Sequence, residues 1–352
     1  MKKVKKLICV IFSLMFVLSC FTVTGSASGR KPALSSSAGI EALRNEFSID
    51  TAPKAGGYAL DYAYYSPVGT NDNGKYPLVI FLHGIGHGDY VGSQLDDSDF
   101  PYWASSELQS RFTSGGAFIL LPRAPEQSLV YWSKSLIESL RAVIDDMIEK
   151  HGDNIDTTKI FIGGSSAGAE MTWDMIIAFP EYFAGAFPIA ATGTVSASDT
   201  KKCADVAIWM IASNLDPVIS YPATTTPLWN NVCANNSNPG NCRLTTLGKV
   251  KEPSGKGASD NHHMAKVVTY DMHMLDGSKY YDSETVDGNG NTLNLTSPNG
   301  MIYWMNSVSS DYVGDKGEGS GNINVSGLTN VFDAIRNFFL KIVNLFQRLF
   351  GL

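Results

Sequence analysis

The sequence is poor in cysteine and short of basic residues. Five of the 352 residues are cysteines, and 27 Lys and Arg residues stand against 34 Asp and Glu residues. The resulting formal charge of −7 argues against nucleic acid or another polyanion as a partner. No spacing of cysteines and histidines indicates a metal site.

The chain begins with a lysine cluster, an apolar run over residues 7–23, and the small residues Gly25, Ser26 and Ala27. This pattern is typical of a secretory signal peptide, and we expect it to span residues 1–27. Cleavage there removes four lysines and no acid, which takes the formal charge from −7 to −11. Lipoprotein processing at Cys20 is the alternative, but the apolar run continues past that cysteine. The mature protein is therefore expected to be secreted or associated with the cell surface.

Export would permit disulfides among the three cysteines that follow the signal. Cys233 and Cys242 bracket a polar loop of Asn, Gly and Pro residues, and we predict that these two are paired. Cys203 would then be a buried free thiol.

The rest of the chain divides by composition into four segments. Residues 28–50 are rich in Ser, Ala and Gly and then weakly helical, and we expect them to form a tether. Residues 51–310 are expected to form a domain. Residues 311–327 are a linker, and residues 328–352 carry apolar side chains at three- and four-residue steps. That spacing predicts an amphipathic helix whose polar face excludes it from spanning a bilayer. A membrane surface, self-association, and packing back on the domain are the alternatives for its apolar face.

Short apolar runs alternate with helical patterns inside the domain. Strands are predicted at residues 58–65, 76–82, 117–121, 159–162, 185–190 and 206–212, and helices at residues 135–150 and 167–179. Runs this continuous in apolar residues are typical of parallel strands buried on both faces. The alternation predicts an α/β fold with a doubly wound, mostly parallel sheet. A β-hairpin at residues 279–297 and a last helix at residues 298–307 are expected to follow.

The most informative motif is Gly164-Ser165-Ser166-Ala167-Gly168, which lies between a predicted strand and a predicted helix. Glycines two residues before and two after Ser166 leave room for a sharp backbone bend. On a strand-to-helix turn this bend exposes the serine hydroxyl and forms the nucleophile elbow of α/β-hydrolases. Ser166 is therefore the predicted nucleophile.

A serine hydroxyl is a weak nucleophile unless a histidine takes its proton and an acid orients that histidine. In α/β-hydrolases the acid and then the histidine follow the serine along the chain, which leaves His262, His263 and His273. His273 lies just before an Asp-Gly turn, where a surface role is expected. His262 and His263 follow a long polar segment suited to a loop at the active edge. His262 is our first choice and His263 the second.

Asp216 is the predicted acid because it stands four residues past the buried strand 206–212. Site residues collect at the carboxyl ends of strands in open α/β sheets. Asp205 lies at the other end of the same strand, and Asp271 follows the favoured histidines.

The oxyanion of the reaction needs backbone N–H donors near Ser166. We predict the amides of Ile85 and Ala167, because glycines flank Ile85 after the strand 76–82 and Ala167 follows the nucleophile. His83, in the same loop, is expected to support the loop rather than to take part in the chemistry.

Taken together, these motifs resemble the secreted bacterial esterases related to feruloyl esterases and polyhydroxybutyrate depolymerases, often described as predicted peptidases. The likeness covers residues 58–307 and rests on residues 77–86, 118–122, 155–161, 164–168, 179–185 and 216–217. The resemblance implies an α/β-hydrolase fold, no cofactor, and ester hydrolysis through an acyl-enzyme on Ser166. The chain departs from that family at Ala167 and Ala169, where Met and Gly are usual. It departs again after His262, where a second histidine stands in place of an early aromatic.

We therefore predict a secreted serine carboxylesterase acting on a small-molecule or polysaccharide-linked ester. A serine peptidase is the close alternative, because both reactions pass through an acyl-enzyme. A surface-binding protein on an idle hydrolase fold is the other alternative. Four aromatic residues are candidates to line a sugar or aryl pocket, although packing is their commoner role: Tyr131, Trp132, Trp229 and Trp304.

Overall fold

The computed structural model describes residues 37–67, 74–85, 90–95, 101–125, 132–191, 195–250, 263, 281–293 and 300–310. The chain divides into two units, Met1–Gly314 and Asp315–Leu352, and all described residues belong to the first. The predicted signal peptide at residues 1–27, the linker at 311–327 and the helix at 328–352 lie outside the described residues. They stay predictions.

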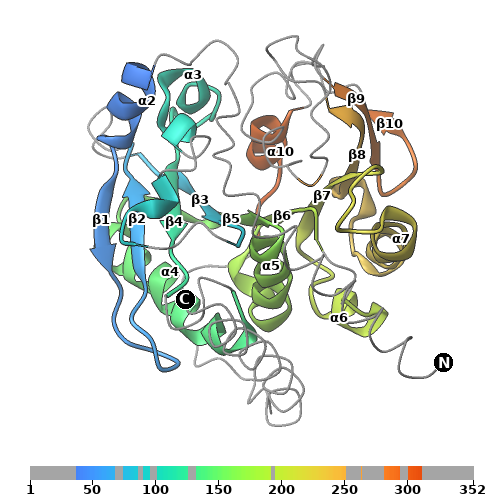
Figure 1. Cartoon of the computed structure of the whole chain (residues 1–352), viewed down its shortest axis with the longest axis horizontal. Helices are drawn as coiled ribbons and strands as arrows, with labels where there is room; N and C mark the ends of the chain where they lie inside the picture. The colour runs from blue at the N-terminus through green and yellow to red at the C-terminus, as the bar shows by residue number, and fades with distance from the viewer. Residues whose placement is uncertain are drawn as a thin grey trace, which may run out of the picture. The chain divides into compact units, whose positions relative to one another are not determined.

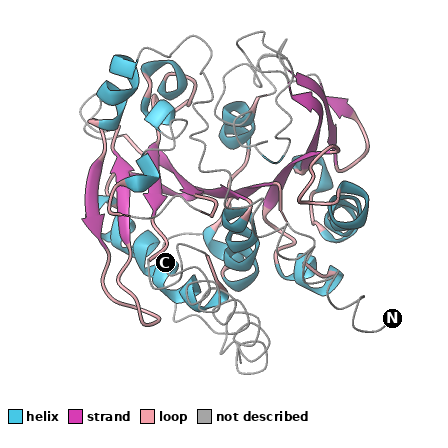
Figure 2. Cartoon of the chain, in the orientation of Figure 1, coloured by secondary structure: helices cyan, strands magenta, loops and turns pink. Residues whose placement is uncertain are grey.

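One ten-stranded sheet forms the framework, in the order β1-β2-β4-β3-β5-β6-β7-β8-β9-β10. The strands are β1 (Ser48–Thr51), β2 (Asp61–Tyr65), β4 (Phe118–Pro122), β3 (Tyr76–Leu82), β5 (Ile155–Ser165), β6 (Gly185–Ile189), β7 (Ala207–Ser213), β8 (Arg243–Val250), β9 (Tyr281–Asp287) and β10 (Thr292–Leu293). The strands from β4 to β8 are parallel, whereas β1, β2, β9 and β10 pair antiparallel at the two edges. Figure 2 shows the strands as a continuous twisted band between helices. The predicted doubly wound, mostly parallel sheet is confirmed.

Helices cover both faces of the sheet (Figure 1). The long helices α4 (Ile137–His151) and α5 (Ala167–Ala178) lie on one face, together with α6 (Ala197–Lys202) and α7 (Thr226–Asn235). The shorter helices α2 (Ser37–Arg44), α3 (Ser106–Gln109) and α10 (Met301–Ser307) lie on the other. The predicted hairpin and last helix are found as β9–β10 and α10.

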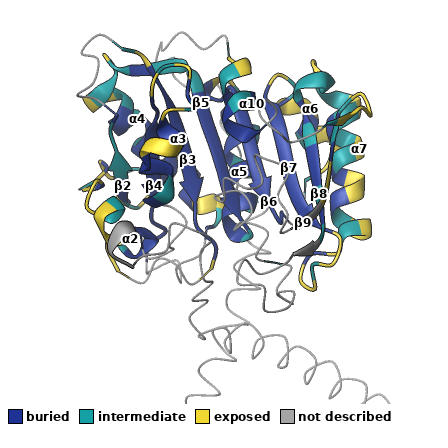
Figure 3. Ribbon diagram, turned by 90° about the horizontal axis from the view of Figure 1, so that it is seen from above, coloured by how far each residue is buried: buried dark blue, intermediate teal, exposed yellow. Residues whose placement is uncertain are grey.

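The central strands are buried along their length because each contributes to two cores. In β3, Leu78, Ile80 and Leu82 belong to the core under α4 and α5, while Val79 and Phe81 belong to the core under α3 and α10. This alternation follows from the two-residue period of a strand. Figure 3 shows these strands in the colour of buried residues, with the exposed positions on the surrounding helices and loops.

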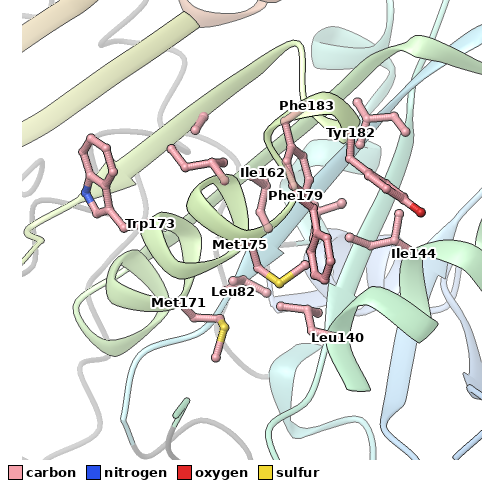
Figure 4. Packing of buried hydrophobic residues seen from close by; sticks show 14 of the residues in the cluster. Leu82, Leu140, Ile144, Ile162, Met171, Trp173, Met175, Phe179, Tyr182 and Phe183 are labelled. Atoms are coloured by element: carbon pink, nitrogen blue, oxygen red, sulfur yellow. The ribbon is translucent and has the colours of Figure 1, made fainter. Parts of the chain in front are cut away.

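Helix α5 is apolar on most of its surface and is held by the core on several sides. Met171, Trp173 and Met175 are at most 1% exposed. Figure 4 shows Met171 and Met175 toward Ile162 of β5, Leu140 of α4 and the aromatic residues that follow α5, with Trp173 on the other side of the helix. The residue that precedes this helix is Ser166, so the helix fixes the position from which the serine side chain projects.

The weakly helical pattern expected in the second half of residues 28–50 is confirmed, but this half belongs to the folded unit and is not a tether. Residues 37–44 form α2, and Ser48–Thr51 forms β1, which pairs antiparallel with β2. The side chain of Lys150 in α4 reaches Asp50 at 2.6 Å. A short edge strand keeps polar residues because its side chains stay exposed, so its composition is that of a linker. The folded domain therefore begins before residue 51.

The predicted Cys233–Cys242 disulfide is also wrong, because both thiols are free. The loop between them is closed by backbone hydrogen bonds instead: the Cys242 amide donates to Pro239 O at 2.9 Å, and the Gly288 amide donates to Pro239 O at 3.0 Å. Cys203 is buried and free, as expected. Burial raises the pKa of Cys203 and of Cys242 to about 12.

Candidate active site

Ser166 sits on a strained turn between β5 and α5. Its backbone has φ 55° and ψ −116°, and a positive φ is uncommon for any residue but glycine. Three backbone hydrogen bonds hold it there: its amide donates to Ile189 O at 3.0 Å, and its carbonyl accepts from Ala169 at 2.9 Å and Glu170 at 3.1 Å. Strain of this kind persists only where the surroundings over-determine it, and it collects at functional sites.

The two glycines of the motif are required by close backbone contacts. A Cβ on Gly168 would lie 2.1 Å from Leu82 O and 2.7 Å from His83 O. A Cβ on Gly164 would lie 2.6 Å from the carbonyl of Gly168. The start of α5 is thus pressed against the end of β3, which no larger residue would allow.

His263 and Asp216 complete a chain of hydrogen bonds with this serine. The His263 Nε2 atom lies 3.0 Å from Ser166 Oγ, and its Nδ1 atom lies 2.8 Å from Asp216 Oδ2. The side chain of Asp216 is 2% exposed and that of His263 is 20% exposed. A buried carboxylate on Nδ1 fixes the proton there and leaves the Nε2 lone pair facing the serine hydroxyl.

The carboxylate of Asp216 is itself held by the turn that follows β7. Its Oδ1 atom accepts the amides of Val218 at 2.7 Å and Ile219 at 2.9 Å. Burial alone would raise the pKa of Asp216, but the hydrogen bonds from His263 and from these two amides hold it below its usual value. Asp216 therefore stays ionised and is ready to orient an imidazole.

Among the predicted site residues, the structure brings Ser166, Asp216 and His263 together. His262, the first choice from sequence, lies outside the described residues. The sequence carries no signal that separates two adjacent histidines, and His263 is the one that the structure shows at the serine. The geometry therefore favours the second choice.

The two predicted oxyanion donors, Ala167 and Ile85, follow Ser166 and Gly84, which lie close together, and their role stays a prediction. Ala167 is the first residue of α5, where an amide has no acceptor within the helix. Ile85 follows Gly84, and a Cβ on Gly84 would lie only 3.8 Å from the Cβ of Ser166. The end of β3 thus runs past the nucleophile.

Sequence reasoning missed a second strained residue at the same edge. Ala190 follows β6, has φ 51°, and donates its amide to Ile211 O at 2.8 Å. Strand β6 lies between β5 and β7, which lead to Ser166 and Asp216. The strained backbone of Ala190 therefore follows the strand that lies between the strands leading to the nucleophile and the acid.

Solved structures share this architecture, whereas no family model and no curated protein matches the chain. A thermostable esterase matches 65% of this chain at 29% identity with a TM-score of 0.54, over 61% of its own length. The chain has the α/β-hydrolase fold. Est1E from Butyrivibrio proteoclasticus matches 64% of this chain and 97% of its own at 14% identity and a TM-score of 0.45. The acylaminoacyl peptidase of Pyrococcus horikoshii matches 53% of this chain and 34% of its own, at 14% identity and a TM-score of 0.39.

The resemblance to esterases that the motifs indicated is thus confirmed at the level of the α/β-hydrolase fold. Bacterial origin and secretion stay predictions.

The four aromatic residues predicted as candidates for a sugar or aryl pocket differ in their burial. Trp132 and Trp304 are at most 2% exposed and take part in packing. Trp229 packs against the main core with part of its surface exposed, and Tyr131 lies outside the described residues.

Within the described residues, no group of three or more His, Cys, Asp or Glu side chains is placed to hold a metal ion. None of their helices has the length and apolar character needed to cross a bilayer.

Proposed function

We propose that the protein is a serine hydrolase that cleaves carboxylic esters through an acyl-enzyme on Ser166. The observation that carries this proposal is the continuous hydrogen-bond chain from Ser166 Oγ through His263 to Asp216, with links of 3.0 and 2.8 Å. Such a chain, on a strained turn at the carboxyl end of a parallel strand, activates a hydroxyl that is otherwise inert at neutral pH.

In the first half-reaction, His263 Nε2 takes the proton from Ser166 as Oγ attacks the ester carbonyl carbon. The carbonyl oxygen becomes an oxyanion, which the amides of Ala167 and Ile85 would stabilise. Asp216 stabilises the imidazolium that forms. His263 then gives the proton to the departing alkoxide, and the alcohol leaves behind an ester on Ser166.

In the second half-reaction, His263 takes a proton from water, and the resulting nucleophile attacks the acyl carbon. Collapse of the second tetrahedral intermediate releases the acid and returns the proton to Ser166 Oγ. All groups return to their starting states, and no cofactor is consumed.

The proposal of an ester rests on two supports beyond the triad geometry. The esterase match at 29% identity is one. The other is a set of exposed apolar side chains on the segments that follow β3 and β7: Ile85 is 62% exposed, Leu215 is 52% exposed and Val218 is 43% exposed. Apolar side chains at the mouth of a site suit a substrate with an apolar group next to its scissile carbonyl.

Labelling with a fluorophosphonate probe tests the nucleophile. Wild-type protein should be labelled on the peptide that contains Ser166, and Ser166→Ala should not be labelled. Ser165→Ala, a change at the neighbouring buried serine, is the matched control and should still be labelled. Unlabelled wild-type protein would favour the non-catalytic alternative instead.

Substrate panels test the bond that is cleaved. We expect turnover of short-chain aryl esters and no measurable cleavage of peptide amides. Because an activated ester is cleaved by either class of enzyme, it is cleavage of a peptide amide that would assign the protein to the peptidases.

We also propose that the protein is exported and that residues 328–352 bind a membrane surface. N-terminal sequencing of secreted protein should start at residue 28. The full-length protein should float with anionic liposomes, and the protein that lacks residues 328–352 should not. Unchanged flotation would leave self-association or packing as the role of this segment.

A further inference from the structure

His83 is a buried histidine that the proposed mechanism does not use. It directly follows β3 and is 1% exposed. Its Nδ1 atom lies 2.7 Å from Gly84 O, and its Nε2 atom accepts the amide of Ala124 at 3.0 Å. Its own carbonyl accepts the indole N–H of Trp132 at 2.9 Å.

These partners determine which nitrogen of the His83 ring carries the proton. A backbone amide can only donate, so Nε2 must carry the lone pair that accepts from Ala124. The proton of a neutral imidazole then sits on Nδ1, where it donates to the carbonyl of Gly84. His83 is therefore held as one neutral tautomer with a single donor, and that donor is directed at the loop beside the nucleophile.

The His83 Nδ1–H donates to the carbonyl of Gly84, which shares a peptide unit with the predicted oxyanion donor, the N–H of Ile85. The carbonyl of Gly84 and the N–H of Ile85 belong to one planar trans peptide, so they point to opposite sides. Fixing the carbonyl on the His83 ring consequently fixes the direction of the Ile85 N–H. The same unit runs close to the nucleophile, since a Cβ on Gly84 would lie 3.5 Å from Ser165 O and 3.8 Å from the Cβ of Ser166.

The ring is in turn held by the segment that follows β4, the strand beside β3. Ala124 is fully buried, and Trp132 is 2% exposed with its ring centroid 5.2 Å from that of His83. The Ala124 amide on Nε2 and the packing of the Trp132 ring leave the imidazole little freedom to rotate away from Gly84. A histidine needed only for packing would not have to present a donor to its own neighbouring peptide.

We infer that His83 is a positioning residue, which holds the Gly84–Ile85 peptide so that the Ile85 N–H faces the oxyanion formed at Ser166. This inference rests on the proposed esterase function and deepens it. Without the Nδ1–H donor the peptide can rotate, and one of the two oxyanion donors is lost.

The test compares an oxoester with the matching thionoester in each variant. Sulfur is a weak hydrogen-bond acceptor, so the thionoester draws little stabilisation from an oxyanion hole. The ratio of the two kcat/KM values therefore reports the oxyanion donors. Because the ratio is taken within one preparation, partial misfolding cancels.

His83→Gln places an acceptor near the former Nε2 position but no donor at Nδ1, whereas His83→Asn places an amide donor near the former Nδ1 position. We expect the oxo-to-thiono ratio to fall at least tenfold in His83→Gln, through kcat rather than KM, and less than threefold in His83→Asn. His151→Gln, the same change at a half-buried histidine at the end of α4, should leave the ratio unchanged.

Equal ratios in His83→Gln and wild type would overturn the inference, as would equal losses in the two His83 variants. Failure of the proposed function has a different signature, because wild-type protein would then hydrolyse neither ester.

Discussion

Replacing Asp216 by Asn changes one atom that faces His263 and leaves the rest of the site in place. The Oδ1 atom of Asn can still accept the amides of Val218 and Ile219, which Asp216 holds at 2.7 and 2.9 Å. The Oδ2 acceptor, 2.8 Å from His263 Nδ1, becomes an NH₂ donor. The imidazole must then accept at Nδ1 and carry its proton on Nε2, where it faces Ser166 as a donor and cannot act as a base.

Asp216→Asn should lower kcat because it removes the correct histidine tautomer and the negative charge beside the imidazolium. In serine hydrolases with this arrangement such a change lowers kcat by about 10⁴-fold, or about 5.5 kcal/mol of barrier. We expect a loss of about 10³- to 10⁴-fold here, because His263 is 20% exposed and water can partly replace the carboxylate. Steady-state hydrolysis of a p-nitrophenyl ester at pH 7.5 measures it.

Asp205→Asn provides the matched control, since Asp205 is an exposed aspartate just before β7, the strand that leads to Asp216. It should keep full activity. Thermal melting confirms that both variants fold. If Asp216→Asn retained more than a tenth of the wild-type kcat, Asp216 would not orient the base, and the reasoning from this geometry would be refuted.

Three further predictions concern stability. Gly168→Ala should lower the free energy of unfolding by about 2–3 kcal/mol, because its Cβ would lie 2.1 Å from Leu82 O; an unchanged urea midpoint would contradict it. Ser166→Gly and Ser166→Ala should both be inactive, but the glycine variant should be about 1 kcal/mol more stable, because it relieves the positive φ of 55°; equal melting temperatures would argue against strain at the elbow. Burial raises the pKa of Asp174 to about 6 despite its ion pair with Lys134. The native state then holds a proton that the unfolded chain loses near the ordinary aspartate pKa of 3.8, so stability falls as pH rises from about 4 to 6. Asp174→Asn should stabilise by about 1–2 kcal/mol at pH 7.5 and by little at pH 4; the same gain at both pH values would show that another group is responsible.

Much of the fold could be predicted because its signals are local. Continuous apolar runs such as residues 76–82 mark strands buried on both faces, and the Gly-x-Ser-x-Gly motif marks a bend that the structure shows to be sterically closed to larger residues. The order of serine, acid and histidine then limited the candidates to a few positions. Asp216 followed from its place after a buried strand.

The remaining features depend on contacts between distant segments. Nothing in a pair of adjacent histidines tells which ring reaches Ser166, since that depends on how a long segment returns to the sheet. The edge strand β1 has a linker's composition because its side chains are largely exposed and its pairing with β2 is made by the backbone. The loop between Cys233 and Cys242 is held by hydrogen bonds from Gly288 in the β9–β10 turn, a distant segment that the spacing of the cysteines does not reveal.

The excursion that carries His263 leaves and rejoins the sheet at neighbouring points, because Val250 of β8 pairs with Tyr281 of β9. The register of β8 against β9 is set outside that excursion, because Arg243 to Leu247 pair with Asp287 to Ser283. The serine and the carboxylate, both held at strand ends, are thus positioned by parts of the sheet whose ladder does not include the residue that supplies the imidazole.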